Sequence, residues 1–307
     1  MEKVSELLGT RYPIIMGALG ALASPELVAA VSEAGGFGLI ATISLDAEGL
    51  RETIHMIRDM TDKPFGANLM ALNPNSPQMV EVLAKEGIEV VTTSAGSPKI
   101  LSSLLQQMGI KVLHVVPSPS LAMKAKDAGV NGVVAEGGES GGMQSANALS
   151  TFCLIPQVVD KVAILVVAAG GIFDARGYAA AFMLGAKGVQ LGTRLILTEE
   201  AAASREYKLA LLEAGPEDTC VLPMQVGPLR ALSNAFVQGL EGLGEDEKRQ
   251  TVTEAWARFN QTVLQDNAMN SLVMTGSCAG AINEILPAGE VIRMIGEEGE
   301  NLLKSNS

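Results

Sequence analysis

One phrase recurs between residues 13 and 191 of the sequence. A stretch with helical periodicity ends at glycine, and a β-branched run begins two or three residues later. Glycine suits the left-handed residue that closes a helix, and short apolar runs alternating with helices are typical of parallel βαβ units. The phrase occurs at Gly35–Gly36 before 37–40, at Gly87 before 90–91, at Gly109 before 112–116, at Gly129 before 133–134 and at Gly185 before 189–191.

Three further apolar runs, 13–16, 65–68 and 163–168, bring the number of expected strands to eight. Eight parallel strands close into a TIM (β/α)8 barrel, a fold that commonly needs about 250 residues. The alternative is an open doubly wound sheet, which normally places a Gly-x-Gly-x-x-Gly turn after its first strand. Residues 16–20 contain two glycines without that spacing, so the barrel is favoured. The composition, 48% hydrophobic with 4% aromatic, suits strands buried on both faces.

The pattern changes after the eighth strand, because residues 195–270 show no strand-like alternation. They read as helical pieces around 207–214, 229–240 and 248–267, and the last barrel helix is expected at 281–295. We therefore predict a barrel formed by residues 1–195 and 271–307, with residues 196–270 inserted after the eighth strand as a helical cap, a substrate domain packed on the barrel mouth.

Charge and cysteine usage exclude several classes of function. The chain has 22 basic and 34 acidic residues, a formal net charge of -12. Nucleic acid and anionic membrane surfaces are therefore poor partners. The amino terminus lacks a secretion signal, and the longest strongly apolar run, 162–169, is shorter than the roughly 20 residues that span a bilayer, so a cytoplasmic protein is expected. The three cysteines are widely spaced, and we expect neither disulfides nor a metal site.

Two glycine loops follow the last two expected strands, where barrel enzymes place their chemistry. The seventh strand ends in Ala169-Gly170-Gly171, and the eighth in Gln190-Leu191-Gly192-Thr193. Glycine lets backbone N–H groups approach an anion, and these are the loops that commonly hold a phosphate in such barrels. The alternative for either loop alone is a tight turn, but both together in the expected places predict phosphate binding.

Two polar residues stand at other strand ends. Asn68 closes the third strand, and its amide could meet a heterocycle that has donors and acceptors, although a turn-forming asparagine is the simpler interpretation. Glu136 follows the sixth strand and precedes the glycine-rich loop 137–142, a composition that indicates close approach by a flat ligand or a mobile backbone. Glu136 and Glu139 could equally be solvated charges, and Glu136 is preferred because it lies nearer the strand.

Neither histidine is placed for catalysis. His55 falls inside an expected helix and His114 inside the fifth strand, so both are interpreted as structural. The sequence shows no Ser/His/Asp arrangement, no paired carboxylates and no metal cluster at strand ends. The chemistry is therefore expected to come from a cofactor.

The ordered motifs resemble one family, the flavin-dependent nitronate monooxygenases together with the FabK-type enoyl-acyl-carrier-protein reductases. Single pieces are common in barrels, but the ordered set is specific and spans nearly the whole chain. The motifs are 63–68 (KPFGAN), 90–96 (VVTTSAG), 115–118 (VVPS), 135–142 (AEGGESGG), 168–172 (AAGGI), 189–194 (VQLGTR) and, in the cap, 227–234 (GPLRALSN).

The resemblance implies a noncovalent flavin mononucleotide (FMN) and assigns residues to it. Its phosphate would lie on Gly170, Gly171, Gly192 and Thr193, flanked by Ala169 and Leu191. Asn68, Glu136, Gly141 and Gln190 would lie near the rest of the flavin, and Met16, Gly17 and Ala18 would run beside its ring.

The motifs at 65–68, 92–93 and 115–118 are more similar to the enoyl reductase branch, which implies reduction of an enoyl thioester with NADH or NADPH. The alternatives are oxidation of alkyl nitronates with O2, reduction of a quinone or other acceptor, or FMN binding without the family's activity. The resemblance also implies a small-molecule or acyl-thioester substrate, acyl carrier protein as a partner, and a homodimer.

Two positions depart from the family. Members usually carry a histidine after the Gly-Gly of the sixth loop, where this chain has Met143, and a thioether cannot transfer a proton. Water, a cap residue or the substrate would then have to supply the proton. Met16 and Leu19 stand where glutamine and methionine are more usual, so the pocket beside the flavin is expected to be more apolar.

Overall fold

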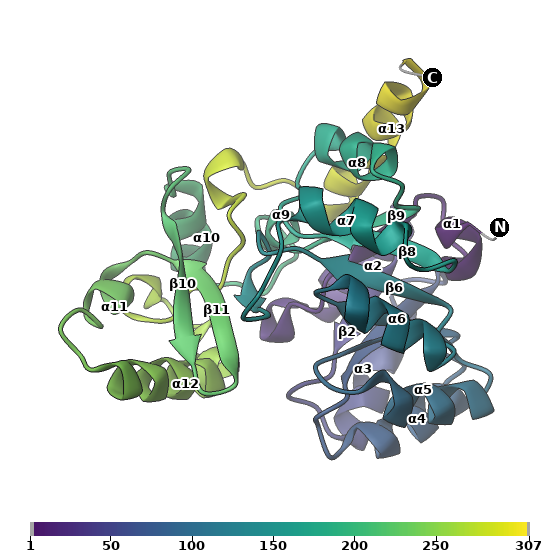
Figure 1. Cartoon of the computed structure of the whole chain (residues 1–307), viewed down its shortest axis with the longest axis horizontal. Coiled ribbons are helices and arrows are strands. Elements are labelled where there is room, and N and C mark those ends of the chain that lie inside the picture. Colours follow the sequence, from purple (N-terminus) through teal and green to yellow (C-terminus); the bar gives the residue numbers. More distant parts are fainter. Residues whose placement is uncertain (1–2, 306–307) are drawn as a thin grey trace.

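The structure is a computed structural model that describes residues 3–305, and it shows a parallel barrel with a smaller cap beside it (Figure 1). The strands follow the order β1-β9-β8-β6-β5-β4-β3-β2, and a bridge between Ile15 and Phe37 joins the two ends. All eight expected runs are strands, which confirms the TIM barrel. The strands are β1 (Ile14–Met16), β2 (Gly38–Ala41), β3 (Phe65–Met70), β4 (Val90–Ser94), β5 (Lys111–Val116), β6 (Gly132–Glu136), β8 (Leu165–Ala169) and β9 (Gly188–Leu191).

Helices cover the outside of the barrel, and local sequence fixes their ends. Ser24, Asp46 and Ser150 each accept a backbone N–H of the helix that follows. Gly109 and Gly185 follow their helices with φ of 75° and 99°, as the recurring phrase predicts. The helices are α1 (Val4–Leu8), α2 (Pro25–Glu33), α3 (Ala47–Arg58), α4 (Ser76–Lys85), α5 (Pro98–Gln107), α6 (Pro119–Asp127), α7 (Thr151–Val159), α8 (Ala175–Met183) and α13 (Ala288–Ser305).

Strand register decides which side chains face the barrel interior. A Cβ on Gly38 would collide with Val28 of α2, so Gly38 faces the helices and its neighbours Phe37 and Leu39 face inward. Residues paired in register share a face, and the pairings can be followed around the whole barrel back to Phe37. This places Asn68, Thr92, Glu136, Ala169 and Gln190 on the interior face.

The cap is not purely helical, which corrects the prediction for residues 195–270. A hairpin of β10 (Thr219–Met224) and β11 (Gly227–Leu232) joins β7 (Gly142–Met143) from the sixth loop to form a three-stranded antiparallel sheet. The helix expected at 229–240 is therefore a strand followed by a four-residue helix, α11 (Ala235–Gln238). The remaining elements are α9 (Thr193–Ile196), α10 (Arg205–Leu212), α12 (Glu245–Thr262) and the 3-10 turns η1 (Gly20–Leu22), η2 (Ala268–Asn270) and η3 (Ala279–Ala281).

The hairpin was missed because its strands do not alternate cleanly. Leu222 and Met224 of β10 and Leu229 of β11 are buried in the cap, but Pro223 and Pro228 interrupt the β-branched pattern that indicates a strand.

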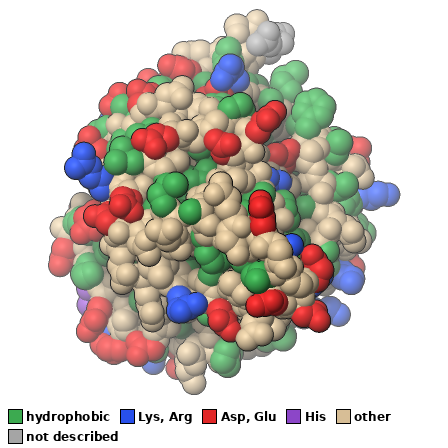
Figure 2. Space-filling view, turned by 90° about the vertical axis from the view of Figure 1, so that its left-hand side faces the viewer, with side chains coloured by type: hydrophobic (Ala, Val, Ile, Leu, Met, Phe, Trp, Pro, Cys, Tyr) green, Lys and Arg blue, Asp and Glu red, His purple; other side chains and the backbone are tan. Residues whose placement is uncertain are grey.

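Seen from the cap side, the surface carries many acidic and few basic side chains (Figure 2).

The last barrel helix also begins later than expected. Residues 279–281 form only a 3-10 turn, and α13 starts at Ala288, directly after Pro287. Within residues 3–305, the structure contains no helix with both the length and the apolar character that crossing a bilayer requires.

Candidate functional site

Polar side chains gather on the interior face of the barrel where its strands end. Asn68 is only 6% exposed; its Nδ2 donates to Thr92 Oγ1 at 2.9 Å, and its Oδ1 accepts from the Ser94 hydroxyl at 3.2 Å. It lies within β3, so it is not the turn asparagine that the sequence also allowed. Gln190 of β9 is on the same interior face. The carboxyl end of the barrel therefore presents amide and hydroxyl groups to its mouth.

Glu136 adds a carboxyl group to this mouth, and no ion pair within residues 3–305 involves it. Burial raises the pKa of Glu136 to about 7, and the nearby Ser140 hydroxyl opposes that rise. Ser140 Oγ is itself buried and has no hydrogen-bond partner of normal geometry, so we regard its effect as the weaker one. Glu136 is half-buried in the mouth, and burial, the dominant cause, favours its protonated form more than in an exposed glutamate.

Glu139 is used quite differently. Its carboxylate accepts the Thr151 N–H at 2.8 and 3.0 Å and the Thr151 hydroxyl at 2.8 Å. The same hydroxyl lies 2.9 Å from the carbonyl oxygen of Gly170. Glu139 thereby ties the sixth loop to α7 and to the seventh strand end. Of the two acids that the sequence singled out, Glu136 is the one left without such a partner.

The two glycine loops leave backbone donors free. Gly170 and Gly171 have φ of 104° and 70°, conformations that favour glycine. Within residues 3–305, the N–H groups of Gly170, Gly171 and Gly192 donate to no carbonyl or side chain. A Cβ on Gly192 would meet only Leu19 Cδ2, at 3.8 Å, so there is open space in front of this loop. Free amides in both loops, with open space in front of Gly192, are what an anion requires.

The first loop reaches this region mainly through its backbone. Gly17 donates its N–H to the carbonyl of Leu191 at 2.8 Å, and a Cβ on Gly17 would lie 3.2 Å from the same oxygen. Met16 pairs in register with Leu191, and both side chains lie on the outer face of the barrel, fully buried. Met16 and Leu191 could therefore contact a ligand in the mouth only through main-chain atoms. Ala18 follows Gly17 and is exposed.

Sequence reasoning missed the segment that returns from the cap to the barrel. Gly276 donates its N–H to Thr193 Oγ1 at 2.8 Å, and Ser277 donates its N–H to the Glu139 carbonyl at 3.0 Å. Gly141 packs so closely on Thr275 that a Cβ would lie 2.5 Å from the Thr275 carbonyl carbon. The run of small residues at 275–281 (TGSCAGA) was the available signal for this close approach.

Met143 connects the sixth loop to the cap. It pairs with Leu229 of β11, and its side chain packs against the buried residues of the cap hairpin. Arg230 Nε donates to the Gly138 carbonyl at 3.0 Å, and Gln144 Nε2 donates to the same oxygen at 2.9 Å. Met143, at the position of the family histidine, therefore lies between the sixth loop and the cap, and its side chain has no proton to exchange.

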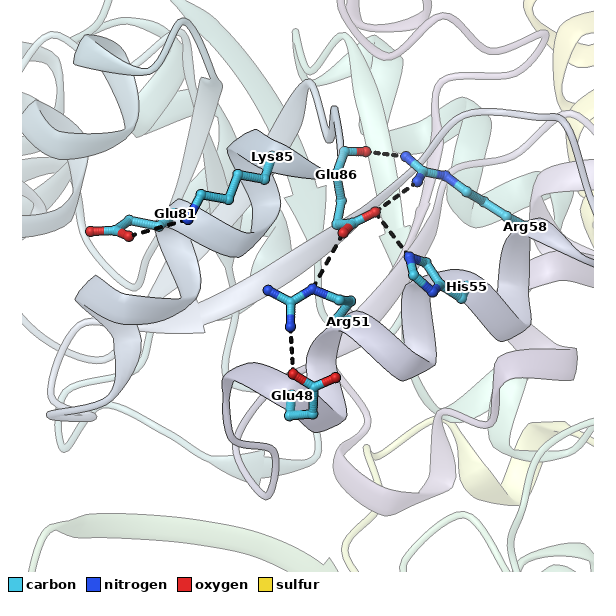
Figure 3. A network of polar contacts seen from close by, with 7 residues as sticks. All are labelled: Glu48, Arg51, His55, Arg58, Glu81, Lys85 and Glu86. Carbon is cyan, nitrogen blue, oxygen red and sulfur yellow. Dashed lines mark hydrogen bonds and ion pairs between the residues drawn. The ribbon is translucent and has the colours of Figure 1, made fainter.

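Both histidines lie away from the mouth. His114 Nδ1 is 2.7 Å from the Thr93 hydroxyl on the outer face of the barrel, and burial lowers the pKa of His114 to about 4. His55 lies on α3 and contacts Glu86 at 3.1 Å, as do Arg58 NH1 at 3.1 Å and Arg51 Nε at 3.5 Å (Figure 3). Glu86 follows α4, so this ionic network lies at the amino end of the strands, opposite the mouth.

Comparison with known proteins agrees with this arrangement. The family model described as nitronate monooxygenase matches residues 1–80 and 76–298. A probable nitronate monooxygenase of Staphylococcus saprophyticus is 31% identical over 281 residues, covering 76% of this chain and 79% of the relative.

Two further relatives are more similar. A (3aS,4S,5R,7aS)-5-hydroxy-7a-methyl-1-oxo-octahydro-1H-indene-4-carboxyl-CoA dehydrogenase of Rhodococcus jostii is 35% identical over 242 residues, covering 78% of this chain and 68% of the relative. Among solved structures, FabK from Thermotoga maritima superposes with a TM-score of 0.93 at 36% identity, covering 100% of this chain and 98% of that one.

Proposed function

Because the chain belongs to the nitronate monooxygenase family of oxidoreductases, we propose that it holds FMN in the barrel mouth and uses it to reduce an enoyl thioester with NADH or NADPH. The observation that carries the cofactor assignment is the set of free amides at Gly170, Gly171 and Gly192 in the two phosphate-type loops, together with the open space in front of Gly192. Arg194, which follows the second loop, donates from NH1 to the carbonyls of Leu197 and Glu284, so the proposal assigns the phosphate to main-chain donors.

The remaining residues of the mouth suit the rest of the cofactor. Asn68 and Gln190 would meet the polar edge of the ring, Gly141 would allow it to approach the sixth loop, and Glu136 lies beside them on the interior face. Thr193 completes the phosphate loop, although its hydroxyl already accepts the Gly276 N–H. FMN supplies two-electron transfer between a nicotinamide and a carbon acceptor, and the chain supplies binding, orientation and exclusion of water.

Two similarities support a thioester as the acceptor. The Thermotoga maritima FabK structure matches this chain over its full length, and the Rhodococcus jostii relative is named for a carboxyl-CoA substrate. The cap would select the acyl group, because its hairpin packs against the sixth loop beside the site. A carrier, either coenzyme A or acyl carrier protein, would remain outside the barrel.

The second candidate is oxidation of an alkyl nitronate with O2, without a nicotinamide. Met143 favours it in one respect, because a nitronate is already a carbanion and needs no base to remove a proton. The Staphylococcus saprophyticus relative bears that activity in its name.

Anaerobic stopped-flow absorbance separates these functions. The protein, loaded with FMN and reduced by NADH or NADPH, is mixed with crotonyl-CoA and with longer enoyl thioesters. Rapid return of the oxidised flavin spectrum is expected. Reduced protein that no enoyl thioester reoxidises would contradict the proposal, and O2 uptake with propionate 3-nitronate would then establish the second candidate. A yellow protein that neither nucleotide bleaches, and that takes up no O2 with propionate 3-nitronate, would instead be a flavin-binding protein without turnover.

A further inference from the structure

The carboxyl group of Glu136 lies in the mouth and forms no ion pair within residues 3–305. Glu136 is the last residue of β6 and lies on the interior face, in register with Ala169. The other acid of this loop, Glu139, is saturated by the Thr151 N–H and hydroxyl. The buried Ser140 hydroxyl, also without a normal partner, lies close to Glu136.

The charged groups nearest this loop all point elsewhere. Arg230 donates to the Gly138 carbonyl and to Thr219 Oγ1, and Arg194 donates to the carbonyls of Leu197 and Glu284. Burial raises the pKa of the Cys278 thiol to about 11, so it stays protonated and neutral. Because no cation among residues 3–305 forms an ion pair with Glu136, burial favours the protonated acid.

We infer that Glu136 is the proton donor of this enzyme, acting in place of the histidine that Met143 replaces. The inference rests on the proposed reduction of an enoyl thioester. FMN, when bound, would supply a hydride that comes from the nicotinamide, and addition of this hydride to the β-carbon would form a C–H bond there and leave an enolate. The enolate electron pair then forms a C–H bond at the α-carbon as the Oε–H bond of Glu136 breaks, and the resulting carboxylate takes a proton from water.

The pH dependence has a definite sign. The donor must be protonated, so the rate of the oxidative half-reaction is constant at low pH and falls as pH rises through the pKa of Glu136, about 7 in the protein without ligand. A bound phosphate adds negative charge to the mouth and moves the break upward. Ser140→Ala removes the hydroxyl that favours the ionised form, so it should also move the break to higher pH.

The test compares half-reactions of the flavin-loaded protein. Measured per bound FMN, Glu136→Gln should slow reoxidation by crotonyl-CoA about 100-fold or more relative to reduction by the nicotinamide, and reoxidation should lose its pH break. Glu136→Asp should recover part of the rate. In the Glu136→Gln background, Met143→His should restore reoxidation by returning an imidazole to the loop, whereas Met143→Leu should not. Reoxidation by the Glu136→Gln variant at the original rate would overturn the inference.

A second readout does not depend on the substrate. Infrared titration of the flavin-loaded protein should show a protonated carboxyl band near neutral pH that is absent in Glu136→Gln. Identical spectra for the two proteins would also overturn the inference. Failure of the original protein to reduce any thioester would contradict the proposed function, and the infrared titration would still decide whether Glu136 carries the proton.

Discussion

The two ends of the barrel treat their polar groups in opposite ways. At the amino end of the strands, the Glu86 carboxylate accepts from Arg58 and lies 3.1 Å from His55 Nε2 and 3.5 Å from Arg51 Nε, and its backbone carbonyl accepts from Arg58 as well (Figure 3). At the carboxyl end, the amides of Gly170, Gly171 and Gly192 have no acceptor within residues 3–305, and Glu136 has no cation. Groups with all their hydrogen bonds made stabilise the fold, whereas half-buried groups without partners at the carboxyl end of a barrel indicate a ligand. Substitutions at the two ends should therefore affect different measurements.

The largest effect is expected at the mouth, for Gly192→Ala. The new methyl group would enter the space in front of the loop, where the protein offers only Leu19 Cδ2 at 3.8 Å. Affinity for FMN should fall by about 100-fold, equivalent to about 2.8 kcal/mol, measured by quenching of flavin fluorescence. The melting temperature of the FMN-free protein should change little, because no protein group is displaced. Unchanged FMN affinity would show that the phosphate lies elsewhere.

An intermediate effect is expected far from the mouth, for Gly299→Ala in α13. A Cβ at this position would overlap the ring of Tyr178, which is 2% exposed. Overpacking of this kind should lower the free energy of unfolding by about 1–3 kcal/mol in denaturant titration, with FMN affinity unchanged. Gly289→Ala is the matched control, because its Cβ would meet the flexible end of Arg293 at 3.3 Å. Equal losses for both variants would contradict the packing argument.

The smallest effect is expected at the amino end, for Glu86→Gln. The Glu86 side chain is 15% exposed and faces two arginines and His55, so removing its charge should cost about 1 kcal/mol, less at high salt. Glu81 is 64% exposed and pairs with Lys85 (Figure 3). Glu81→Gln should therefore cause no measurable change in the free energy of unfolding. Thermal melts at low and high salt distinguish the two. A loss at position 86 that salt does not reduce would argue against an ionic origin.

The barrel wall was predictable because helix and strand follow distinct periods there. Five of the eight strands follow a helix that ends at glycine, and buried strands read as continuous apolar runs, so Val133–Val134 and Val189–Leu191 were found at their true positions. The hairpin of the cap carries Pro223 and Pro228 within its strands, and its pairing with Gly142–Met143 joins segments nearly ninety residues apart. A pairing between segments this far apart cannot be predicted from any local sequence pattern.

The site was predictable only in part, for a similar reason. Strand ends identified Asn68, Glu136 and Gln190, because the carboxyl end of a barrel collects them whatever their separation along the chain. The opposite uses of Glu136 and Glu139 depend on where Thr151 falls, and the contact of Gly276 with Thr193 depends on how the chain returns from the cap. Both contacts depend on the tertiary fold and leave no periodic pattern in the sequence.

The pairing of β7 with β11 has a consequence for protein engineering. Exchanging residues 196–270 with the corresponding insertion of a relative would remove the strand against which Gly142 and Met143 are held, together with Arg230, which anchors Gly138. A chimaera built at those boundaries would inherit a barrel whose sixth loop has lost its support. To transfer substrate preference between relatives, residues 138–144 must therefore be exchanged together with the insertion.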